Sequence, residues 1–259
     1  MNINSIGFIG GGRVTRIFLS GLKAAGVKLS SVVVSDPNAE TLGKLKAMFP
    51  GITVAGPDNT QPAAQDLVLL AVHPPAIAGV LPGIKGAHRP GAVLVSLAPK
   101  FTLAKLSELL GGFNRIARMI PNAPSVMGAG YNPVTFGAGL GASDKQALTG
   151  LFTLLGDCPE VAEPKLEAFA LLTGMGPTYL WFQLQTLCEL ALSFGLSDGD
   201  ITPALKRMVC GAARTLLESG LSPAEVMDLI PVKPLAEDEP AIKAAYQNRL
   251  PALFAKIKP

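Results

Sequence analysis

The chain has 259 residues, enough for two domains, because single domains commonly span about 100 to 200 residues. Hydrophobic residues make up 49% of it and charged residues 16%, and its net charge of +3 is spread along the chain without a basic block. This composition disfavours a nucleic-acid partner and predicts that another subunit covers part of the apolar surface.

The N-terminus, the apolar segments and the cysteines predict a cytoplasmic protein without a membrane span. The first residues, "MNINSIGFIGGGR", have no basic stretch before their short apolar run, which argues against a signal peptide. The longest apolar segment, residues 166–194, is interrupted by glycines and a proline and therefore favours buried helices. Three widely spaced cysteines match no metal or redox motif and predict reduced thiols and no metal site: Cys158, Cys188 and Cys210.

Short apolar runs alternate with helix-period segments up to about residue 160. We expect strands at residues 5–10, 31–35, 52–55, 66–72, 92–98 and 115–120. We expect helices at residues 13–25, 39–48, 75–81 and 103–110. A further strand near residues 131–139 and a helix capped by Ser143 complete this half. Such alternation predicts a mostly parallel sheet covered on both faces.

From residue 161 onwards the pattern is helical. We expect helices at residues 166–172, 178–194, 202–219 and 223–229. The second of these is apolar around most of its circumference, and a small monomeric domain cannot bury such a helix by itself. We therefore predict that this half forms a homodimer or a higher homo-oligomer through its helices.

The segment "SIGFIGGGRVTRIFLSGL" places Gly10 and Gly12 between the first strand and the first helix. Such a turn lets a pyrophosphate approach the backbone closely, and the helix N-terminus supplies amide donors and a partial positive charge. Thr15 stands at the third glycine position of the GxGxxG pattern and must fit by a small displacement. The pattern predicts a dinucleotide site.

Asp36, at the end of the second strand, suits hydrogen bonding to the adenosine ribose of NAD. Arg13 or Arg16 could instead reach the 2'-phosphate of NADP, so the choice between NADP and NAD stays open. The sequence therefore predicts an α/β, Rossmann-type nucleotide-binding domain over residues 1–160 and an all-α dimerisation domain over residues 161–259.

The chain resembles the pyrroline-5-carboxylate reductase family along nearly its whole length. The resemblance lies in "GFIGGGRVT", "LLAVHPP", "RMIPNAPSVMGAG", "LLTGMGPTYL" and "CGAARTLLESGLSPAEVMDLIP", which occur in the family's order and spacing. It implies an oxidoreductase that reduces a cyclic imine to proline with hydride from NAD(P)H. It also implies that the helical domain interlocks with that of a partner and carries the substrate.

The resemblance implies a cofactor contact for residues in the loops at the strand ends. His73 replaces a lysine of the family's "AVKP" loop, and contact with the cofactor, loop packing and proton donation all stay open for it. The implied cofactor residues are Gly10, Gly12, Arg13, Val14, Ser35, Asp36, Asn59, Ala71, Val72, His73, Pro74, Ser96, Ala98 and Asn122.

The substrate motifs depart from the family. Its "SGSGPAY" is here "TGMGPTY", and its "SPGGTT" aligns with "IPVKPL", which has neither the glycines nor the threonines. Lys233 could pair with a substrate carboxylate or be a solvated loop residue, and Tyr179 could donate a proton or be a core residue, so no catalytic residue is assigned. The candidate substrate pocket comprises Met175, Gly176, Pro177, Lys233 and Leu235.

Three functions follow from these departures. The first is an NAD(P)H-dependent reductase of a small-molecule imine, with pyrroline-5-carboxylate as default substrate. The second is a reductase of a more apolar imine or carbonyl compound, and the third is a nucleotide-binding paralogue without this activity. A beta-hydroxyacid dehydrogenase is disfavoured because "TGMGPTYLWFQLQ" lacks that family's lysine.

Overall fold

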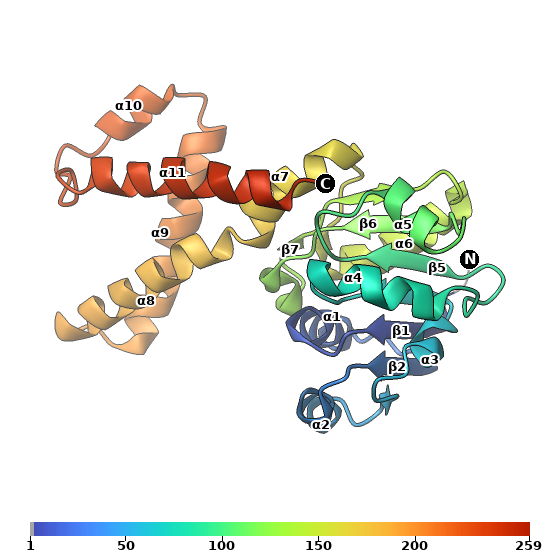
Figure 1. Cartoon of the computed structure of the whole chain (residues 1–259). Helices are drawn as coiled ribbons and strands as arrows, with labels where there is room; N and C mark the ends of the chain where they lie inside the picture. Colours follow the sequence, from blue (N-terminus) through green and yellow to red (C-terminus); the bar gives the residue numbers. More distant parts are fainter. Residues whose placement is uncertain (1–2) are drawn as a thin grey trace. The chain divides into compact units, whose positions relative to one another are not determined.

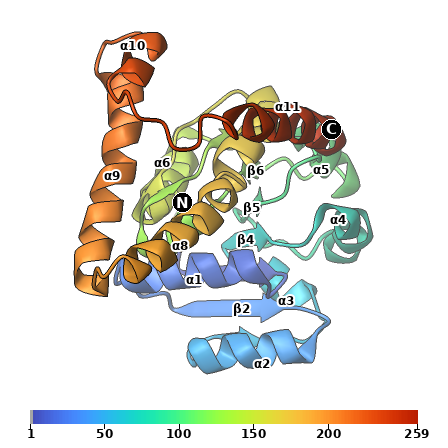
Figure 2. The same cartoon turned by 90° about the vertical axis from the view of Figure 1, so that its left-hand side faces the viewer.

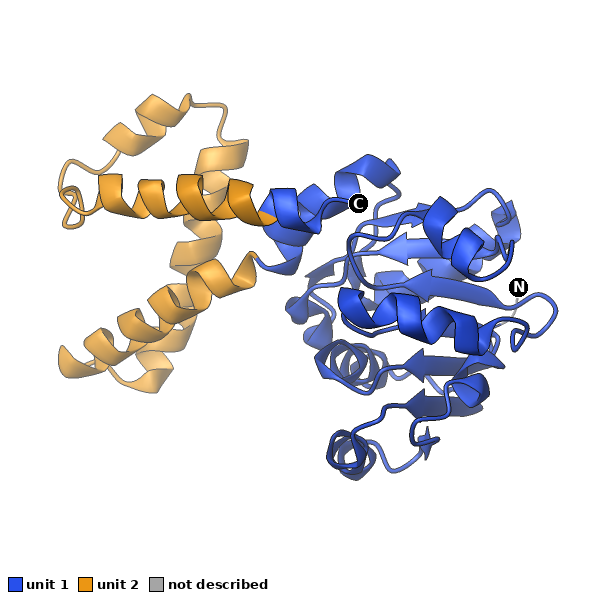
Figure 3. Cartoon of the chain, viewed as in Figure 1, with its two compact units in different colours: residues 1–175, 254–259 blue, residues 176–253 orange. Residues whose placement is uncertain are grey.

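The computed structural model describes residues 3–259, so the first two residues of the predicted N-terminal segment lie outside it. The chain forms two compact units, Met1–Met175 with Phe254–Pro259, and Gly176–Leu253 (Figure 3). The strand signals of the sequence stop near residue 160, but Leu166 and Ala170 pack on Ile120 in a small core of the first unit. Residues 161–175 have a helical sequence pattern, but they belong to the first unit by their contacts.

The first unit is built on a seven-stranded sheet with the order β3-β2-β1-β4-β5-β6-β8 (Figures 1 and 2). Every strand pairs in parallel with its neighbours except β8, which runs antiparallel to β6. In the centre, Ile6 of β1 lies opposite Val32 of β2 and Leu67 of β4. The strands confirm the predicted runs: β1 Ser5–Ile9, β2 Ser31–Ser35, β3 Thr53–Val54, β4 Leu67–Leu70, β5 Val93–Ser96, β6 Ile116–Met119 and β8 Val134–Phe136.

Helices cover both faces of this sheet because successive strand side chains point to opposite sides. One core gathers Ile6, Phe8 and their neighbours under α1 (Arg13–Ala24), α2 (Ala39–Met48) and α6 (Ala142–Phe152). The other core gathers Ile9 and its neighbours under α3 (Thr60–Ala63), α4 (Pro74–Val80), η1 (Leu81–Ile84) and α5 (Leu103–Leu109). The predicted two-sided sheet is confirmed.

Aromatic packing ties α1 to the sheet and to α6. The ring of Phe18 meets Phe8 and Phe152 edge to face, with centroid distances of 6.3 and 6.2 Å. All three side chains are at most 1% exposed. Such pairs stabilise by about 0.5–1.5 kcal/mol each beyond the burial of their area, so they fix the helix that carries the glycine turn.

The helix predicted to follow a Ser143 cap begins two residues earlier, at Ala142, and Ser143 is not its cap. The N-cap position is Gly141, whose N–H donates to Oδ2 of Asp144 at 3.1 Å. The carboxylate at the third helical position thus satisfies an amide that a serine cap would leave alone. The rest of this region comprises η2 (Ala123–Met127), η3 (Thr153–Leu155) and a small parallel sheet of β7 (Gly130–Tyr131) and β9 (Gly156–Asp157).

Short helical pieces lead from β9 to the end of the first unit: η4 (Glu163–Lys165), α7 (Leu166–Phe169) and η5 (Ala170–Gly174). The last of these is a π-helical turn, a rare widening that often occurs near functional sites. The predicted helix over 166–172 is therefore present, but it changes its hydrogen-bond spacing halfway.

The second unit consists of α8 (Pro177–Ser193), α9 (Asp198–Glu218), α10 (Pro223–Asp228) and most of α11 (Glu239–Ile257). The helix expected from residue 202 starts at Asp198, because Ser197 and Asp200 form a reciprocal capping box. The sequence prediction missed α11, whose pattern is interrupted by Pro251 inside the helix. Within this unit only Ile201 is buried among the described residues.

None of the helices in residues 3–259 combines the length and apolarity that crossing a membrane requires.

Candidate functional site

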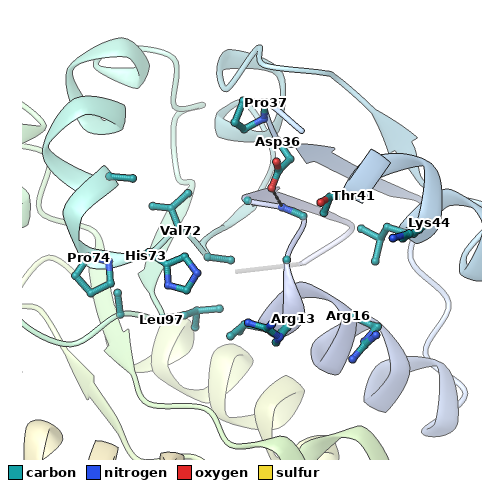
Figure 4. A pocket seen from close by; sticks show the side chains of 18 of the residues that line it. Arg13, Arg16, Asp36, Pro37, Thr41, Lys44, Val72, His73, Pro74 and Leu97 are labelled. Atoms are coloured by element: carbon teal, nitrogen blue, oxygen red, sulfur yellow. Dashed lines mark hydrogen bonds between the residues drawn. The ribbon is translucent and has the colours of Figure 1, made fainter. Parts of the chain in front are cut away.

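A cavity of about 710 Å³ opens in the first unit at the carboxyl ends of β1, β2, β4 and β5 (Figure 4). The chain leaves β1 toward one side of the sheet and returns to β4 on its other side, and ligands of open parallel sheets bind at such a point. The wall comprises Gly10, Gly11, Gly12, Arg13, Val14, Arg16, Asp36, Pro37, Thr41, Lys44, Leu45, Met48, Ala71, Val72, His73, Pro74, Ala76, Leu97, Ala98 and Pro99.

The glycine turn has a backbone that only glycine adopts easily. Gly10 has a φ of +103°, and a Cβ added there would lie 2.6 Å from the carbonyl oxygen of Ala71. Gly12 has no atom within 4 Å of an added Cβ, so the space before the N-terminus of α1 is open. Thr15 is fully buried and its hydroxyl donates to the carbonyl of Gly10 at 2.5 Å. The threonine therefore fits by bonding to the turn.

Asp36 joins the second strand to this turn. Its Oδ2 accepts the N–H of Gly11 at 2.8 Å, and its Oδ1 accepts the N–H of Asn38 at 2.8 Å. Each oxygen retains acceptor capacity after one hydrogen bond. The side chain lies on the cavity wall, as Figure 4 shows.

Cations face Asp36 across the cavity from α1 and α2. Arg13 and Arg16 belong to the first turns of α1, and Lys44 belongs to α2 (Figure 4). Lys44 also pairs with the exposed Glu40 at 2.6 Å, a contact of little strength at the surface. Sequence reasoning missed the contribution of α2, although Thr41, Lys44 and Met48 have the spacing of one helix face.

Most of the residues expected to contact the cofactor lie on this wall: Gly10, Gly12, Arg13, Val14, Asp36, Ala71, Val72, His73, Pro74 and Ala98. Four others do not, and they stay predictions: Ser35, Asn59, Ser96 and Asn122.

Ser35, Ser96 and Asn122 are buried in the unit, and Asn59 is half-buried. The hydroxyl of Ser35 donates to Oδ1 of Asn59 at 2.7 Å, and Oδ1 of Asn122 accepts the N–H of Tyr131 at 3.1 Å. The hydroxyl of Ser96 is buried and has no hydrogen-bond partner among residues 3–259.

The expected substrate residues fall in both units. In the first unit, Met175 follows the π-helical turn and its N–H donates to the carbonyl of Ala170 at 2.9 Å. In the second unit, Gly176 and Pro177 begin α8.

Lys233 and Leu235 lie in the exposed loop between α10 and α11. The carbonyl of Lys233 accepts the N–H of Ala236 at 3.1 Å, and the carbonyl of Leu235 accepts the N–H of Glu239 at 3.0 Å. Leu235 is 65% exposed. The loop is thus a folded turn that leads into α11 and presents apolar side chains to solvent.

Tyr179 packs edge to face on Tyr246 within the second unit, with ring centroids 5.7 Å apart. Burial, and then the neighbouring Tyr246, raises the pKa of the Tyr179 phenol. The phenol therefore stays protonated at neutral pH. This geometry is compatible with either reading of Tyr179, as a packed aromatic residue or as a proton donor.

Comparison with known proteins identifies the family. The model of the family described as "NADP oxidoreductase coenzyme F420-dependent" matches residues 5–100. Pyrroline-5-carboxylate reductase of Pseudomonas aeruginosa is 28% identical over 254 residues, which cover 98% of this chain and 92% of that protein. Pyrroline-5-carboxylate reductase 3 of Macaca fascicularis is 30% identical over 226 residues, which cover 85% of this chain and 80% of that protein. The chain belongs to the pyrroline-5-carboxylate reductase family.

Solved structures of pyrroline-5-carboxylate reductases share the fold. The Plasmodium falciparum enzyme, solved with NADP bound, has a TM-score of 0.81 at 22% identity and covers 99% of this chain and 97% of its own. The Coxiella burnetii enzyme has a TM-score of 0.68 at 29% identity and covers 99% of this chain and 95% of its own. The predicted class, a Rossmann-type domain followed by a helical region, is confirmed.

Proposed function

We propose that this protein reduces the C=N bond of pyrroline-5-carboxylate to form proline, with a nicotinamide dinucleotide as hydride source. The observation that carries the proposal is the similarity to pyrroline-5-carboxylate reductases over nearly the whole chain. The cavity at the strand ends supports the proposal, because its wall carries a glycine turn and cations suited to a dinucleotide. Positioning of the imine carbon and stabilisation of charge are the main demands on the protein.

The residues of the cavity fit a dinucleotide. Gly10 and Gly12 let the backbone approach a pyrophosphate, and the first turn of α1 offers amide donors that have no partner within the helix. Arg13 adds a positive charge beside them. When bound, the cofactor supplies the hydride, and the chain holds it through these groups.

The cations on the wall favour NADP over NAD. Arg13, Arg16 and Lys44 face a single carboxylate, Asp36, which already accepts two backbone N–H groups. A 2'-phosphate at the adenosine end would be attracted by these cations. We expect NADPH to bind at least ~10-fold more tightly than NADH, and Arg16→Ala to remove most of that difference, because charge-assisted contacts contribute about 1.5–3 kcal/mol.

Titration calorimetry of wild type and Arg16→Ala with both cofactors measures this preference. Lys23→Ala, which changes a cation in the last turn of α1 away from the cavity wall, is the matched control. Equal affinities of the wild type for NADPH and NADH would contradict the preference.

A homodimer or larger homo-oligomer that assembles through the helices of the second unit is part of the proposal. The apolar side chains there that a partner would cover include Trp181 at 51%, Phe182 at 66% and Phe194 at 77% exposure. A unit that buries so little apolar surface by itself is not stable alone, so a second copy is the natural cover.

A cytoplasmic location is also proposed, with Cys158, Cys188 and Cys210 as free thiols in support. Fractionation of cells that express the native gene would check it.

The substrate is proposed to meet the loops that carry Met175 to Pro177 and Lys233 to Leu235. Lys233 provides the positive charge that a carboxylate needs. Lys243 lowers the pKa of the neighbouring Glu239 most, and the charge of Lys233 lowers it further. Met175 and Leu235 provide apolar contacts. The departures from the family's hydroxyl and glycine motif predict a weaker grip on the carboxylate, and hence a raised KM.

The test is turnover of pyrroline-5-carboxylate by the purified oligomer with NADPH and with NADH, followed by loss of reduced nicotinamide and appearance of proline. Proline formation with either cofactor supports the proposal. Faster reduction of imines without a carboxylate would instead identify an apolar substrate. Tight cofactor binding with no reduction of any imine would identify a nucleotide-binding paralogue.

A further inference from the structure

A buried charge cluster in the first unit contacts the loop that follows β5. Arg118, on β6, is fully buried, its Nη1 donates to Oε1 of Glu163 at 2.9 Å, and its Nη2 donates to Oε1 of Glu167. The side chain of Glu167 is 3% exposed and that of Glu163 is 26% exposed. A buried guanidinium is costly unless it is paired, and apolar residues of the same volume often stabilise a core as well. The cluster therefore calls for a role other than stability.

The two carboxylates hold a loop as well as the guanidinium. Oε1 of Glu167 accepts the backbone N–H of Lys100 at 3.2 Å, and Oε1 of Glu163 accepts the backbone N–H of Leu103 at 2.6 Å. These amides belong to the last residue of the bend that follows β5 and to the first residue of α5. The turn is thus fastened at two points to a segment some sixty residues further along the chain.

The fastened loop carries part of the cavity wall. Leu97, Ala98 and Pro99 line the cavity and lead directly into Lys100. Lys100 has a φ of +84°, the one positive φ of a non-glycine residue within residues 3–259. Such a backbone costs conformational energy and persists only where surrounding contacts enforce it. The carboxylates of Glu163 and Glu167 supply two such contacts at this loop.

We propose that Glu163, Glu167 and Arg118 are positioning residues that fix the Leu97–Pro99 wall against the reacting groups. This inference rests on the proposed reductase function. A bound cofactor ring and imine react only at near-contact distance, so a small shift of the wall that shapes the cavity slows the reaction more than it weakens the fold. Glu163 lies in η4 and Glu167 in α7, and these elements lead through η5 to Met175. The two carboxylates thus connect the Leu97–Pro99 wall to a segment that we expect at the substrate.

The test compares three variants of the full-length oligomer. Glu163→Ala removes the acceptor for Leu103 and one partner of Arg118, Glu163→Gln keeps the acceptor, and Glu160→Ala changes a 54% exposed glutamate of the same segment as matched control. We expect Glu163→Ala to lower kcat at saturating cofactor ~10-fold or more, with Glu163→Gln recovering most of the loss and Glu160→Ala unchanged.

A second substitution separates positioning from loss of stability. Lys100→Gly placed in the Glu163→Ala background should restore part of kcat, because glycine adopts a φ of +84° without the strain that lysine has there. If Glu163 only stabilised the fold, Lys100→Gly would raise the Tm of the Glu163→Ala variant but leave its kcat unchanged.

Amide hydrogen exchange in a peptide covering residues 97–103 measures how firmly the loop is held and needs no turnover. It therefore distinguishes failure of this inference from failure of the proposed function. We expect faster exchange in Glu163→Ala than in wild type or Glu160→Ala. Wild-type exchange in Glu163→Ala, or wild-type kcat together with a lowered Tm, would overturn the proposal.

Discussion

The first unit buries most of its large apolar side chains within itself, whereas the second unit leaves most of its own on the surface of a single chain. Phe8, Phe18 and Phe152 are at most 1% exposed, while Phe182 and Phe194 are 66% and 77% exposed. The first unit therefore has its stabilising contacts within one chain. The second unit has helix caps and turns but buries few apolar side chains, so its stability would depend on the proposed oligomer.

A charge placed on the apolar surface of α8 should have the largest effect. Phe182→Asp should prevent assembly, because a carboxylate in a covered apolar interface costs several kcal/mol. We expect turnover to fall ~100-fold or more and the second unit to lose helical structure, since a residue truncated at an interface centre commonly costs 2 kcal/mol or more. Light scattering and circular dichroism measure the two effects.

Val54→Asp is the matched control, because Val54 is an apolar residue of the first unit that is 41% exposed at the edge strand β3. Edge strands tolerate charge, so assembly and turnover should stay at the wild-type level. An oligomer that survives Phe182→Asp would show that α8 is not the covered surface.

Two glycines of the first unit separate folding from binding. Gly10→Ala meets both a positive φ and the carbonyl of Ala71, so we expect a loss of about 1–3 kcal/mol of stability and almost all cofactor affinity. Gly12→Ala meets no atom within 4 Å and should keep the stability while its methyl group occupies the space for a pyrophosphate. We expect its cofactor Kd to rise ~10-fold or more, a cost typical of a displaced charge-assisted contact.

Chemical unfolding and cofactor titration on the same preparations measure both effects. Gly150→Ala, in the last turn of α6 with no atom near an added Cβ, is the control and should raise stability by up to about 0.5–1 kcal/mol. Unchanged cofactor binding in Gly12→Ala would show that the pyrophosphate does not lie at this turn.

The sheet and its two-sided cover could be predicted because each strand is a continuous apolar run bounded by turn residues. The errors occur where a signal is ambiguous. Ser143 has the right residue type for a cap, but Asp144 takes the N–H of Gly141 instead. The helix α11 was missed because Pro251 breaks its pattern, while the surrounding sequence still keeps it helical.

The cavity could be predicted at the glycine turn and the strand ends, where backbone geometry restricts residue type. The side of the cavity formed by Thr41 and Lys44 could not, because ordinary helix residues there differ from any solvated face only by their position in space. The contacts from Glu163 and Glu167 to the loop after β5 join positions too far apart for a local pattern to show.

The smallest effect is expected from the carboxylates that cap a helix in each unit, Asp144 in the first and Glu225 in the second. Burial raises the pKa of Asp144, but hydrogen bonds from Arg115 and from the N–H of Gly141 outweigh it and hold the pKa below its ordinary value of 3.8. In the second unit, the Ser222 hydroxyl and then its N–H lower the pKa of the fully exposed Glu225. A pKa lowered by folding stabilises the folded state above the ordinary pKa, and this contribution is lost as pH falls through the lowered value.

Asp144→Asn should therefore lower the free energy of unfolding by about 1 kcal/mol at neutral pH, because Arg115 loses its counter-charge at 3.0 Å. The difference from wild type should vanish in acid below the lowered pKa, where the wild-type carboxyl is itself protonated. Glu225→Gln should change stability less at every pH, since solvent screens an exposed cap. Urea unfolding, followed by circular dichroism at neutral and acidic pH, measures the free energy of unfolding of each variant. A deficit of Asp144→Asn that persists in acid would mean that the shape of the side chain, and not its charge, stabilises α6.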